Sequence, residues 1–377
     1  QPPSPTCGEC FTQTHRFRLK NAAPMSELTE AEIAALMAAD EIARAAGVPR
    51  GPNPRVGCVI LSSSGRTIAS GFHRGAGTPH AEVAALAAAG AQARAATAVV
   101  TLEPCDHTGR TGPCSQALID AGIARVVFAV ADPGGDSGGG AQRLRAAGIE
   151  VIHAADEAGA QVPVADIESF LRPWLIATKR GRPFVTLKTA ATLDGRVAAA
   201  DGTSRWITGP SARADVHRLR GEVDAVIVGT GTAIADNPSL TVRDAQGARH
   251  GVQPLRVVVG SRDLPVSSRL AAPAEGEGGV VHLRTHDAPL VLAELFNLGV
   301  RHALIEGGPT LAAAFIRAGM VDQWVSFIAP IALGAGPSAV GDLGVSTITA
   351  ASAWEVREVV QLDTDVKITA VPKEATD

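Results

Sequence analysis

The chain has 377 residues, a formal net charge of −4 and 46% hydrophobic residues, a composition typical of a globular protein long enough for two domains. A general nucleic-acid binder would normally be basic, so the charge argues against that class but leaves room for a local basic pocket for a small phosphorylated substrate. No apolar run reaches the roughly 18 residues that a membrane span requires. The five cysteines give no disulfide framework, which indicates a reducing cytoplasm.

The first segment has no continuous apolar core, so we interpret residues 1–25 as a disordered extension with Met25 as the functional start. A capping box follows, because Thr29 and Glu32 can each satisfy a free backbone N–H at the start of a helix. An apolar strand comes next, preceded by Asn53 between two prolines. Its backbone is therefore extended, and its amide can either fill a turn or recognise the edge of a pyrimidine.

Strands and helices alternate through the rest of the first half of the chain. The pattern predicts strands near Ile68 and over residues 56–61, 98–101, 125–130 and 150–152, and helices over residues 80–89, 115–121 and 141–147. Such alternation favours a three-layer α/β domain, which we place at residues 26–155. Asp132 follows a strand at its carboxyl end, where sheets of this kind generally bind ligands.

One imidazole and two thiols in this domain are the ligand types that Zn²⁺ prefers. They belong to His80, Cys105 and Cys114, and a catalytic zinc keeps three protein ligands and leaves the fourth position to water. Glu82 lies two residues from the histidine, close enough to reach that water. This arrangement is typical of zinc deaminases, in which the activated water attacks an amino-bearing ring carbon and the glutamate carries protons. We also expect Cys105 at the start of a helix, where the helix dipole favours its thiolate.

The spacing of the two cysteines distinguishes this motif from its relatives. Nucleoside and nucleic-acid deaminases usually show P-C-x-x-C, whereas residues 106–113 separate the cysteines here. A loop of that length, carrying His107 and Arg110, can form part of a substrate pocket. The alternative interpretation is a structural zinc site, which would need a fourth protein ligand and no carboxylate between its ligands.

The second half of the chain also alternates strands and helices. We interpret residues 156–183 as a helical connector in which Trp174 packs, and residues 184–373 as a second α/β domain. Strands are predicted over residues 184–189, 224–229, 255–259, 280–283 and 302–306, and helices over residues 211–220, 290–298 and 311–318. The glycines at 307 and 308 precede a helix and leave backbone N–H groups free for an anion such as a dinucleotide pyrophosphate. No G-x-G-x-x-G follows a strand, which argues against a Rossmann domain.

Taken together, these motifs resemble the family of bacterial bifunctional riboflavin-biosynthesis proteins, a diaminohydroxyphosphoribosylaminopyrimidine deaminase fused to an aminouracil phosphoribosyl reductase. The resemblance rests on residues 53–57, 80–82, 101–105 and 114, and in the second half on residues 193–196, 206–208, 232–243 and 306–311. It implies a cytidine-deaminase-like N-terminal domain and a dihydrofolate-reductase-like C-terminal domain that uses NADPH. Three positions depart from the family pattern, because Gly134 stands where an asparagine is usual, Asp106 where a serine is usual and Gly112 where a proline is usual.

The resemblance also implies which residues carry each activity. In the deaminase it places one Zn²⁺ on His80, Cys105 and Cys114, makes Glu82 the catalytic proton carrier, and assigns substrate binding to Asn53, His107, Arg110 and Asp132. In the reductase it assigns substrate binding to Ser204, Arg220, Leu240, Arg243 and Glu306. The implied cofactor-binding residues are Ala190, Trp206, Thr232, Asp236, Ser261, Gly308, Pro309, Thr310 and Leu311. Lys188 and Asp194 are expected to position the sugar.

The implied reactions are hydrolytic deamination of 2,5-diamino-6-(5-phosphoribosylamino)pyrimidin-4-one, followed by NADPH-dependent reduction of the ribosyl side chain to ribityl. The expected partner is this small phosphorylated pyrimidine, with no nucleic acid and no membrane, and the family suggests a homo-oligomer. One rival is a zinc-dependent nucleoside or tRNA deaminase with an appended domain, which the cysteine spacing and the acidic balance disfavour. A rival of another class is a non-catalytic zinc-binding regulatory protein.

Overall fold

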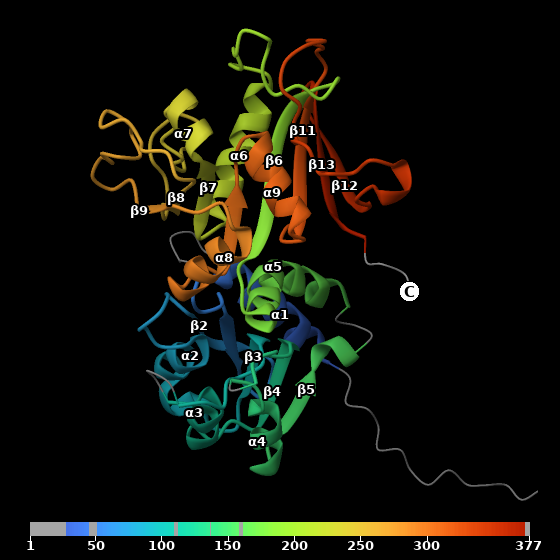
Figure 1. The fold of residues 1–377 in the computed structure, drawn as a ribbon. Helices are drawn as coiled ribbons and strands as arrows, with labels where there is room; N and C mark the ends of the chain where they lie inside the picture. Colours follow the sequence, from blue (N-terminus) through green and yellow to red (C-terminus); the bar gives the residue numbers. More distant parts are fainter. Residues whose placement is uncertain (1–27, 45–50, 109–111, 136, 158–160, 374–377) are drawn as a thin grey trace, which may run out of the picture.

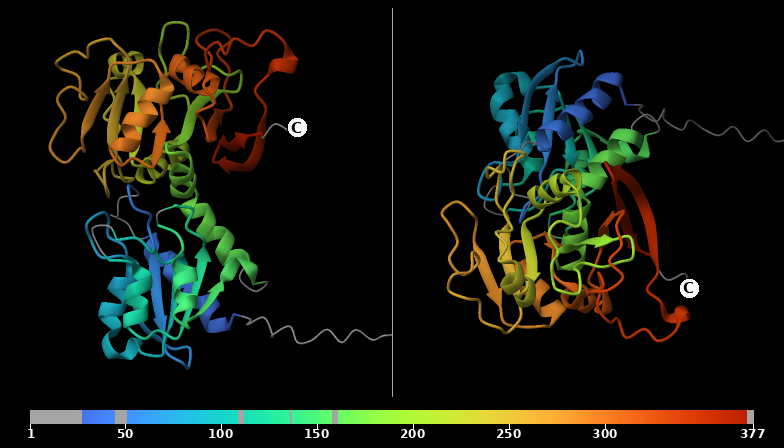
Figure 2. Two further views of the ribbon diagram at one scale, coloured as in Figure 1. Left: turned by 60° about the horizontal axis from the view of Figure 1, so that its bottom comes forward. Right: turned by 90° about the horizontal axis from the view of Figure 1, so that it is seen from above.

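The computed structural model of the protein describes residues 28–44, 51–108, 112–135, 137–157 and 161–373. The predicted N-terminal extension, Met25 and Arg110 lie outside these ranges. The chain forms two lobes, one around each of two β-sheets, with helix α5 (Gln161–Arg180) between them (Figures 1 and 2). Within the described ranges, no helix is both long enough and apolar enough to cross a membrane.

The first lobe contains a five-stranded sheet in the order β2-β1-β3-β4-β5. Its strands are β1 (Gly57–Leu61), β2 (Thr67–Phe72), β3 (Thr97–Leu102), β4 (Arg125–Val130) and β5 (Glu150–His153). Strand β1 pairs antiparallel with β2 and β3, whereas β3, β4 and β5 are parallel. The carboxyl ends of β3 and β4 therefore lie side by side, and the loops that follow them meet at one edge of the sheet.

Helices cover both faces of this sheet and complete the predicted three layers. Helices α1 (Glu30–Ala43) and α5 pack together on one face, and α2 (Ala81–Ala89), α3 (Cys114–Asp120) and α4 (Gly140–Ala146) follow one another on the other. The predicted capping box of α1 is confirmed, because Thr29 Oγ1 accepts from the Glu32 amide at 3.2 Å and the Glu32 carboxylate accepts from the Thr29 amide at 2.9 Å.

Two glycines allow the backbone of this lobe to pack more closely than side chains would permit. A Cβ added at Gly57 would lie 1.9 Å from the Ala39 carbonyl oxygen, so glycine lets α1 approach the start of β1. A Cβ added at Gly140 would lie 1.7 Å from the Pro104 carbonyl oxygen. The start of α4 is therefore in contact with the segment that carries Cys105.

The second lobe is built on an eight-stranded sheet in the order β12-β13-β11-β6-β10-β7-β8-β9. The strands are β6 (Phe184–Thr192), β7 (Ala225–Gly229), β8 (Leu255–Val259), β9 (Val280–Leu283), β10 (His302–Ile305), β11 (Gln323–Ala329), β12 (Trp354–Leu362) and β13 (Asp365–Pro372). Strands β6 to β11 are parallel, and β13 and β12 extend the sheet in antiparallel fashion.

Side-chain parity divides the second sheet into two faces. On one face, Val185 and Leu187 belong to the core beneath α8 (Ala288–Asn297) and α9 (Pro309–Arg317). On the opposite face, Val226 and Leu304 lie in an apolar cluster that includes Leu219 of α6 (Pro210–Gly221). Helix α7 (Thr230–Asp236) follows β7 at the sheet's carboxyl edge. The sequence analysis did not predict α7 or strands β11 to β13.

Helix α5 belongs structurally to the first lobe as well as to the connection. Its residues Val164, Ile167 and Leu171 are buried in the same hydrophobic cluster as strands β3 and β4. Its last turn leads through a short segment into β6, where Arg182 donates to both oxygens of Asp322 at 2.7 and 2.8 Å. The helix therefore carries packing contacts from one sheet to the edge of the other.

Candidate active sites

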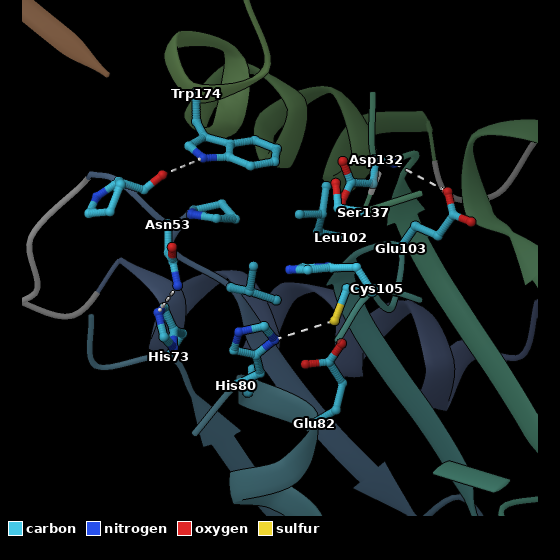
Figure 3. A pocket seen from close by; sticks show the side chains of 15 residues that line it. Asn53, His73, His80, Glu82, Leu102, Glu103, Cys105, Asp132, Ser137 and Trp174 are labelled. Atoms are coloured by element: carbon cyan, nitrogen blue, oxygen red, sulfur yellow. Dashed lines mark hydrogen bonds between the residues drawn. The ribbon is translucent and has the colours of Figure 1, made fainter. Parts of the chain in front are cut away.

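The structure brings His80, Cys105 and Cys114 together at the edge of the first sheet. His80 is the N-cap residue of α2, Cys105 lies in the loop after β3, and Cys114 is the first residue of α3. Their ligand atoms lie within 4.8 Å of one another, with Sγ to His80 Nδ1 distances of 3.5 Å for Cys105 and 3.3 Å for Cys114. Figure 3 shows the imidazole of His80 facing the sulfur of Cys105.

These distances match the requirements of tetrahedral zinc. With Zn–S near 2.3 Å and Zn–N near 2.0 Å, a tetrahedral angle separates the nitrogen from each sulfur by about 3.5 Å. Among the residues that the structure describes, no fourth His, Cys, Asp or Glu joins the group. The donor set therefore fits a zinc ion with one open position, which is the arrangement of catalytic sites rather than of structural ones.

One detail of the sequence prediction is wrong. Cys105 was expected at the start of a helix, but it lies in a loop, and the helix begins at Cys114. The chain is extended at Pro113, and the helical conformation begins only after it, at the second cysteine. The dipole of α3 therefore acts on Cys114, while Cys105 is reached by the Cys114 backbone N–H, 3.5 Å from its sulfur.

Burial and mutual contact perturb the acidities of this cluster. Glu82 is 4% exposed in the first turn of α2, and burial raises the pKa of its carboxyl group to about 7. A hydrogen bond from Cys114 lowers the pKa of Cys105 to about 4, and the same contact raises the pKa of Cys114. One proton shared between two sulfurs explains the opposite shifts, and a bound cation would displace it.

A cavity of about 240 Å³ opens beside these ligands (Figure 3). Its lining includes four residues predicted to bind metal, protons or substrate, namely His80, Glu82, Cys105 and His107. Asn53 and Asp132 line it as well, so the structure brings every described deaminase residue of the prediction except Cys114 to the cavity wall. Cys114 is fully buried.

A histidine fixes the orientation of the Asn53 amide. The Pro79 carbonyl lies 3.0 Å from His73 Nδ1, so this nitrogen carries the ring proton. Burial lowers the pKa of His73, which favours the neutral ring and leaves Nε2 as an acceptor. The Asn53 Nδ2 group, 3.1 Å away, then donates to it. The amide oxygen of Asn53 remains as the acceptor that the side chain can offer to a ligand.

Sequence reasoning missed four polar or aromatic residues of the cavity wall, namely His73, Glu103, Ser137 and Trp174. Glu103 accepts from the amides of Asp132 at 3.2 Å and Ala141 at 3.0 Å, and thereby holds the loops after β3 and β4 together. Its position in the Glu-Pro-Cys motif was the available signal. Ser137 and Trp174 had no local signal, because a serine in a glycine-rich loop and a tryptophan on an apolar helix face are ordinary.

In the second lobe, an ion cluster lies on the face of the sheet covered by α6. Parallel strands β6 and β10 place Leu187 opposite Ile305. The residues that follow them, Lys188 and Glu306, therefore project from the same face of the sheet. Lys188 Nζ lies 3.8 Å from Glu306, whose two oxygens also accept from Arg220 at 2.6 and 3.0 Å. Burial alone would raise the pKa of Glu306, but Arg220 and Lys188 outweigh it and lower that pKa. Burial lowers the pKa of Lys188.

The second predicted arginine has different surroundings. Arg243 donates through Nε to Thr241 Oγ1 at 3.1 Å and through Nη1 to the Gly247 carbonyl at 2.7 Å. Within the described part of the chain, its guanidinium has no carboxylate partner, whereas Arg220 forms a bidentate pair with Glu306. Arg243 therefore retains more capacity to bind an anion than Arg220 does.

The carboxyl edge of the second sheet gathers several of the predicted cofactor residues. Gly308 is the N-cap of α9, and a Cβ added there would lie 3.2 Å from Thr232 Oγ1 at the start of α7. Pro309, Thr310 and Leu311 form the first turn of α9, and Ser261 is exposed just beyond β8. Two helix N-termini and a loop thus meet where parallel sheets generally bind ligands.

The remaining residues predicted for the reductase site lie in different environments, some exposed and some buried. Trp206 is 70% exposed, with the Arg213 guanidinium 4.6 Å from its ring centre. Leu240 is buried in an apolar cluster, so only its backbone, with φ of 55°, can face a ligand. The carboxylate of Asp194 accepts from the amides of Leu333 and Gly334, which makes it a loop anchor. Ser204 and Ala190 are half-buried, and Asp236 is exposed at the end of α7.

The fold and the ligand set define a class, a cytidine-deaminase-like zinc enzyme fused to a dihydrofolate-reductase-like domain. Two family models agree with this. "Cytidine and deoxycytidylate deaminase zinc-binding region" matches residues 29–130, and "RibD C-terminal domain" matches residues 183–368.

Individual relatives match along most of the chain. The riboflavin biosynthesis protein RibD of Mycobacterium tuberculosis (strain H37Rv) is 46% identical over 322 residues, covering 85% of this chain and 92% of the relative. RibD of Escherichia coli (strain K12) is 37% identical over 346 residues, covering 84% and 92%. The structure is similar to that of Acinetobacter baumannii RibD, with a TM-score of 0.80, 37% identity and coverage of 91% and 99%. A deaminase/reductase from Thermotoga maritima gives a TM-score of 0.76 at 31% identity, with the same coverage.

The chain therefore belongs to the RibD family of riboflavin biosynthesis proteins. It is a bifunctional enzyme, a zinc-dependent deaminase joined to a reductase, and its cofactors are Zn²⁺ and NADPH. Its substrate is a small molecule. The predicted family, fold class and pair of activities are confirmed, and the rival of a nucleoside or tRNA deaminase with an appended domain is not favoured.

Proposed function

We propose that His80, Cys105 and Cys114 hold the zinc ion and that Glu82 carries protons between water and the pyrimidine. The observation that supports this most directly is the 3.3 to 3.5 Å separation of the sulfurs from His80 Nδ1, with the Glu82 carboxyl group buried beside them. Zinc held by such a set makes a water acidic near neutral pH. A carboxyl group with a pKa near 7 can both accept and return a proton under those conditions.

The chain's own residues then account for each proton of the hydrolysis. Glu82 takes a proton as water adds to the amino-bearing ring carbon, and protonates the adjacent ring nitrogen. It takes the second proton of the adding water and gives it to the amino group, which leaves as ammonia while a carbonyl forms. Asn53, held by His73, offers its amide oxygen to an N–H of the ring, and His107, Arg110 and Asp132 complete the substrate site.

For the reductase we propose that Arg243 binds the substrate's phosphate. Its guanidinium has neutral oxygen partners, whereas Glu306 occupies Arg220 with two hydrogen bonds. Arg220 and Glu306 with Ser204 and Leu240 then surround the ribosyl chain, and Lys188 and Asp194 position the sugar. Bound NADPH would supply the hydride for reduction at C1 of the ring-opened ribose. The cofactor's site is at the edge formed by Thr232, Ser261 and the first turn of α9, with Ala190, Trp206 and Asp236.

A coupled assay tests both halves of the proposal. Purified protein with 2,5-diamino-6-(5-phosphoribosylamino)pyrimidin-4-one should release ammonia and then oxidise NADPH. Glu82→Gln should keep one zinc per chain. Its rate of ammonia release should fall by at least about 100-fold, which is the usual contribution of a positioned proton carrier. Ammonia release by this variant at the wild-type rate would remove Glu82 from the mechanism.

The reductase assignment has its own test with the deaminated substrate. Arg243→Gln should raise the KM for the phosphorylated pyrimidine far more than the KM for NADPH, because it removes a charge-assisted contact to phosphate. Arg218→Gln is a matched control, because Arg218 already pairs with Asp215 and Glu222 on the same side of the lobe. Equal increases in both KM values would place Arg243 outside the phosphate site.

Three further features belong to the proposal. The enzyme self-associates, as the family resemblance suggests, and it works in the cytoplasm, which is supported by the three described cysteines being free thiols. The deaminase domain spans residues 26–155, the connector residues 156–183 and the reductase residues 184–373. Size measurement of the purified protein and limited proteolysis test the first and the last of these.

A further inference from the structure

A tryptophan from the connecting helix forms part of the deaminase cavity. Trp174 is on α5, but its side chain lines the cavity that also contains Asn53, His80 and Glu82. Figure 3 shows its indole reaching the cavity from α5, across from His80 and Glu82. The zinc ligand set and the proton carrier leave this residue without a role.

The position of the indole is fixed from two directions. Its Nε1–H donates to the Pro52 carbonyl oxygen at 3.0 Å, directly before Asn53 in the chain. On the other side, Ile167 and Leu171 bury the face of α5 in the core of the first lobe. Trp174 itself is half-buried and packs against the same core. A tryptophan held at both its ring nitrogen and its helix is a rigid surface, and little side-chain entropy is lost when a ligand covers it.

The other walls of the cavity make a flat ligand the best fit for this surface. Its reactive end is polar, with His80 and Glu82, whereas Pro54, Leu102 and Trp174 contribute apolar surface. A pyrimidine has a polar edge and two apolar π-faces, so its edge matches the first group and a face matches the second. An indole is the largest aromatic surface among the lining residues.

We propose that Trp174 is a substrate-binding residue of the deaminase, an aromatic wall against which the pyrimidine ring of the substrate packs. This inference rests on the proposed assignment of the cavity as the deaminase substrate site. It adds that the segment joining the two domains supplies part of that site. The wall acts on binding of the ring, and the proton steps remain with Glu82.

The test separates the ring from the rest of the helix. Trp174→Ala should raise the deaminase KM about 5- to 100-fold, the range for removing an aromatic platform beneath a base, with a smaller change in kcat. Trp174→Phe keeps a ring and loses the bond to Pro52, and should recover most of the lost affinity. Reductase activity of the same preparations on the deaminated substrate should be unchanged, which shows that the chain is folded. Trp354→Phe, in the second lobe, is the matched control and should alter neither deaminase constant.

Each outcome decides between defined alternatives. A wild-type KM in Trp174→Ala, or equal KM values for Trp174→Ala and Trp174→Phe, overturns the role of the ring. A parallel loss of reductase activity also overturns it, because the tryptophan would then serve only to pack α5. If the wild-type enzyme with one zinc per chain releases no ammonia, the proposed function fails. If the wild-type enzyme deaminates the substrate and both Trp174 variants keep its KM, the proposed function stands and only the role of Trp174 is refuted.

Discussion

The buried carboxyl group of Glu82 should make the zinc-free enzyme less stable as pH rises. Its folded pKa is about 7 and its ordinary value is 4.5, so between these values the folded state binds more protons than the unfolded state. Stability then falls with increasing pH across this interval. Glu82→Gln replaces the carboxyl group with a neutral one of the same shape and removes this dependence.

The size of the effect follows from the two pKa values. One pKa unit corresponds to about 1.4 kcal/mol. The pKa shift of Glu82 therefore lowers the free energy of unfolding by about 3 kcal/mol at pH 8 and by about 1 kcal/mol at pH 5. Zinc-free Glu82→Gln should therefore be more stable than wild type by these amounts. His80, Cys105 and Cys114 face Glu82 in both proteins, and Cys58 packs nearby, so their own titrations largely cancel in the comparison.

Urea unfolding in EDTA, followed by circular dichroism at pH 5 and pH 8, measures this difference. The second lobe is identical in the two proteins, so its transition is an internal reference. An advantage of the variant that is the same at both pH values, or larger at pH 5, would refute the reasoning from burial. Adding zinc should reduce the difference in stability between Glu82→Gln and the wild type, because a cation beside Glu82 favours its ionised form.

Further predictions concern the metal, a glycine and a buried ion pair. A zinc chelator should abolish ammonia release and leave NADPH oxidation on the deaminated substrate unchanged, as an assay of the two reactions would show. Gly140→Ala should weaken zinc binding, because the new Cβ would displace the Pro104 carbonyl next to Cys105. Gly135→Ala is the control and should leave zinc binding unchanged, because its Cβ would meet no neighbour within 4 Å. Competition with a chelator measures the zinc affinity of both variants. Arg256→Met should destabilise the second lobe by about 3 kcal/mol in urea unfolding, because it removes the fully buried partner of the Glu277 carboxylate. The more exposed Arg249, 3.6 Å away, would remain as a partner of Glu277.

The parts of this enzyme that sequence could predict are those determined by neighbours along the chain. The capping box of α1 needs only Thr29 and Glu32, three residues apart, and it forms as expected. The metal cluster needs ligand types rather than coordinates, so His80 and the two cysteines were identifiable although 34 residues separate the first from the last. Strand and helix alternation gave the architecture of both lobes.

The parts that sequence could not predict depend on distant contacts. Trp174 meets Pro52 across 122 positions, and its spacing on α5 is the same as that of a packing residue. Strand β12 has mostly exposed side chains, and it exists because β13 pairs with it, so its sequence carries little apolar alternation. The helix expected at Cys105 begins at Cys114 because the chain stays extended through Pro113, and the intervening loop has no periodic pattern to reveal this.

The connecting helix packs against both lobes. Val164, Ile167 and Leu171 are buried in the core of the first lobe, and Trp174 lines its cavity. The end of the helix leads to Arg182, which donates to Asp322. Asp322, whose side chain is 3% exposed, also accepts from the Val185 amide at 2.8 Å. We therefore expect a shift of the second sheet to be transmitted through α5 to the wall of the cavity that Trp174 lines. Weakening this junction with Arg182→Gln should raise the deaminase KM although the substitution lies in the other lobe, and an unchanged KM would show that α5 is held by the first lobe alone.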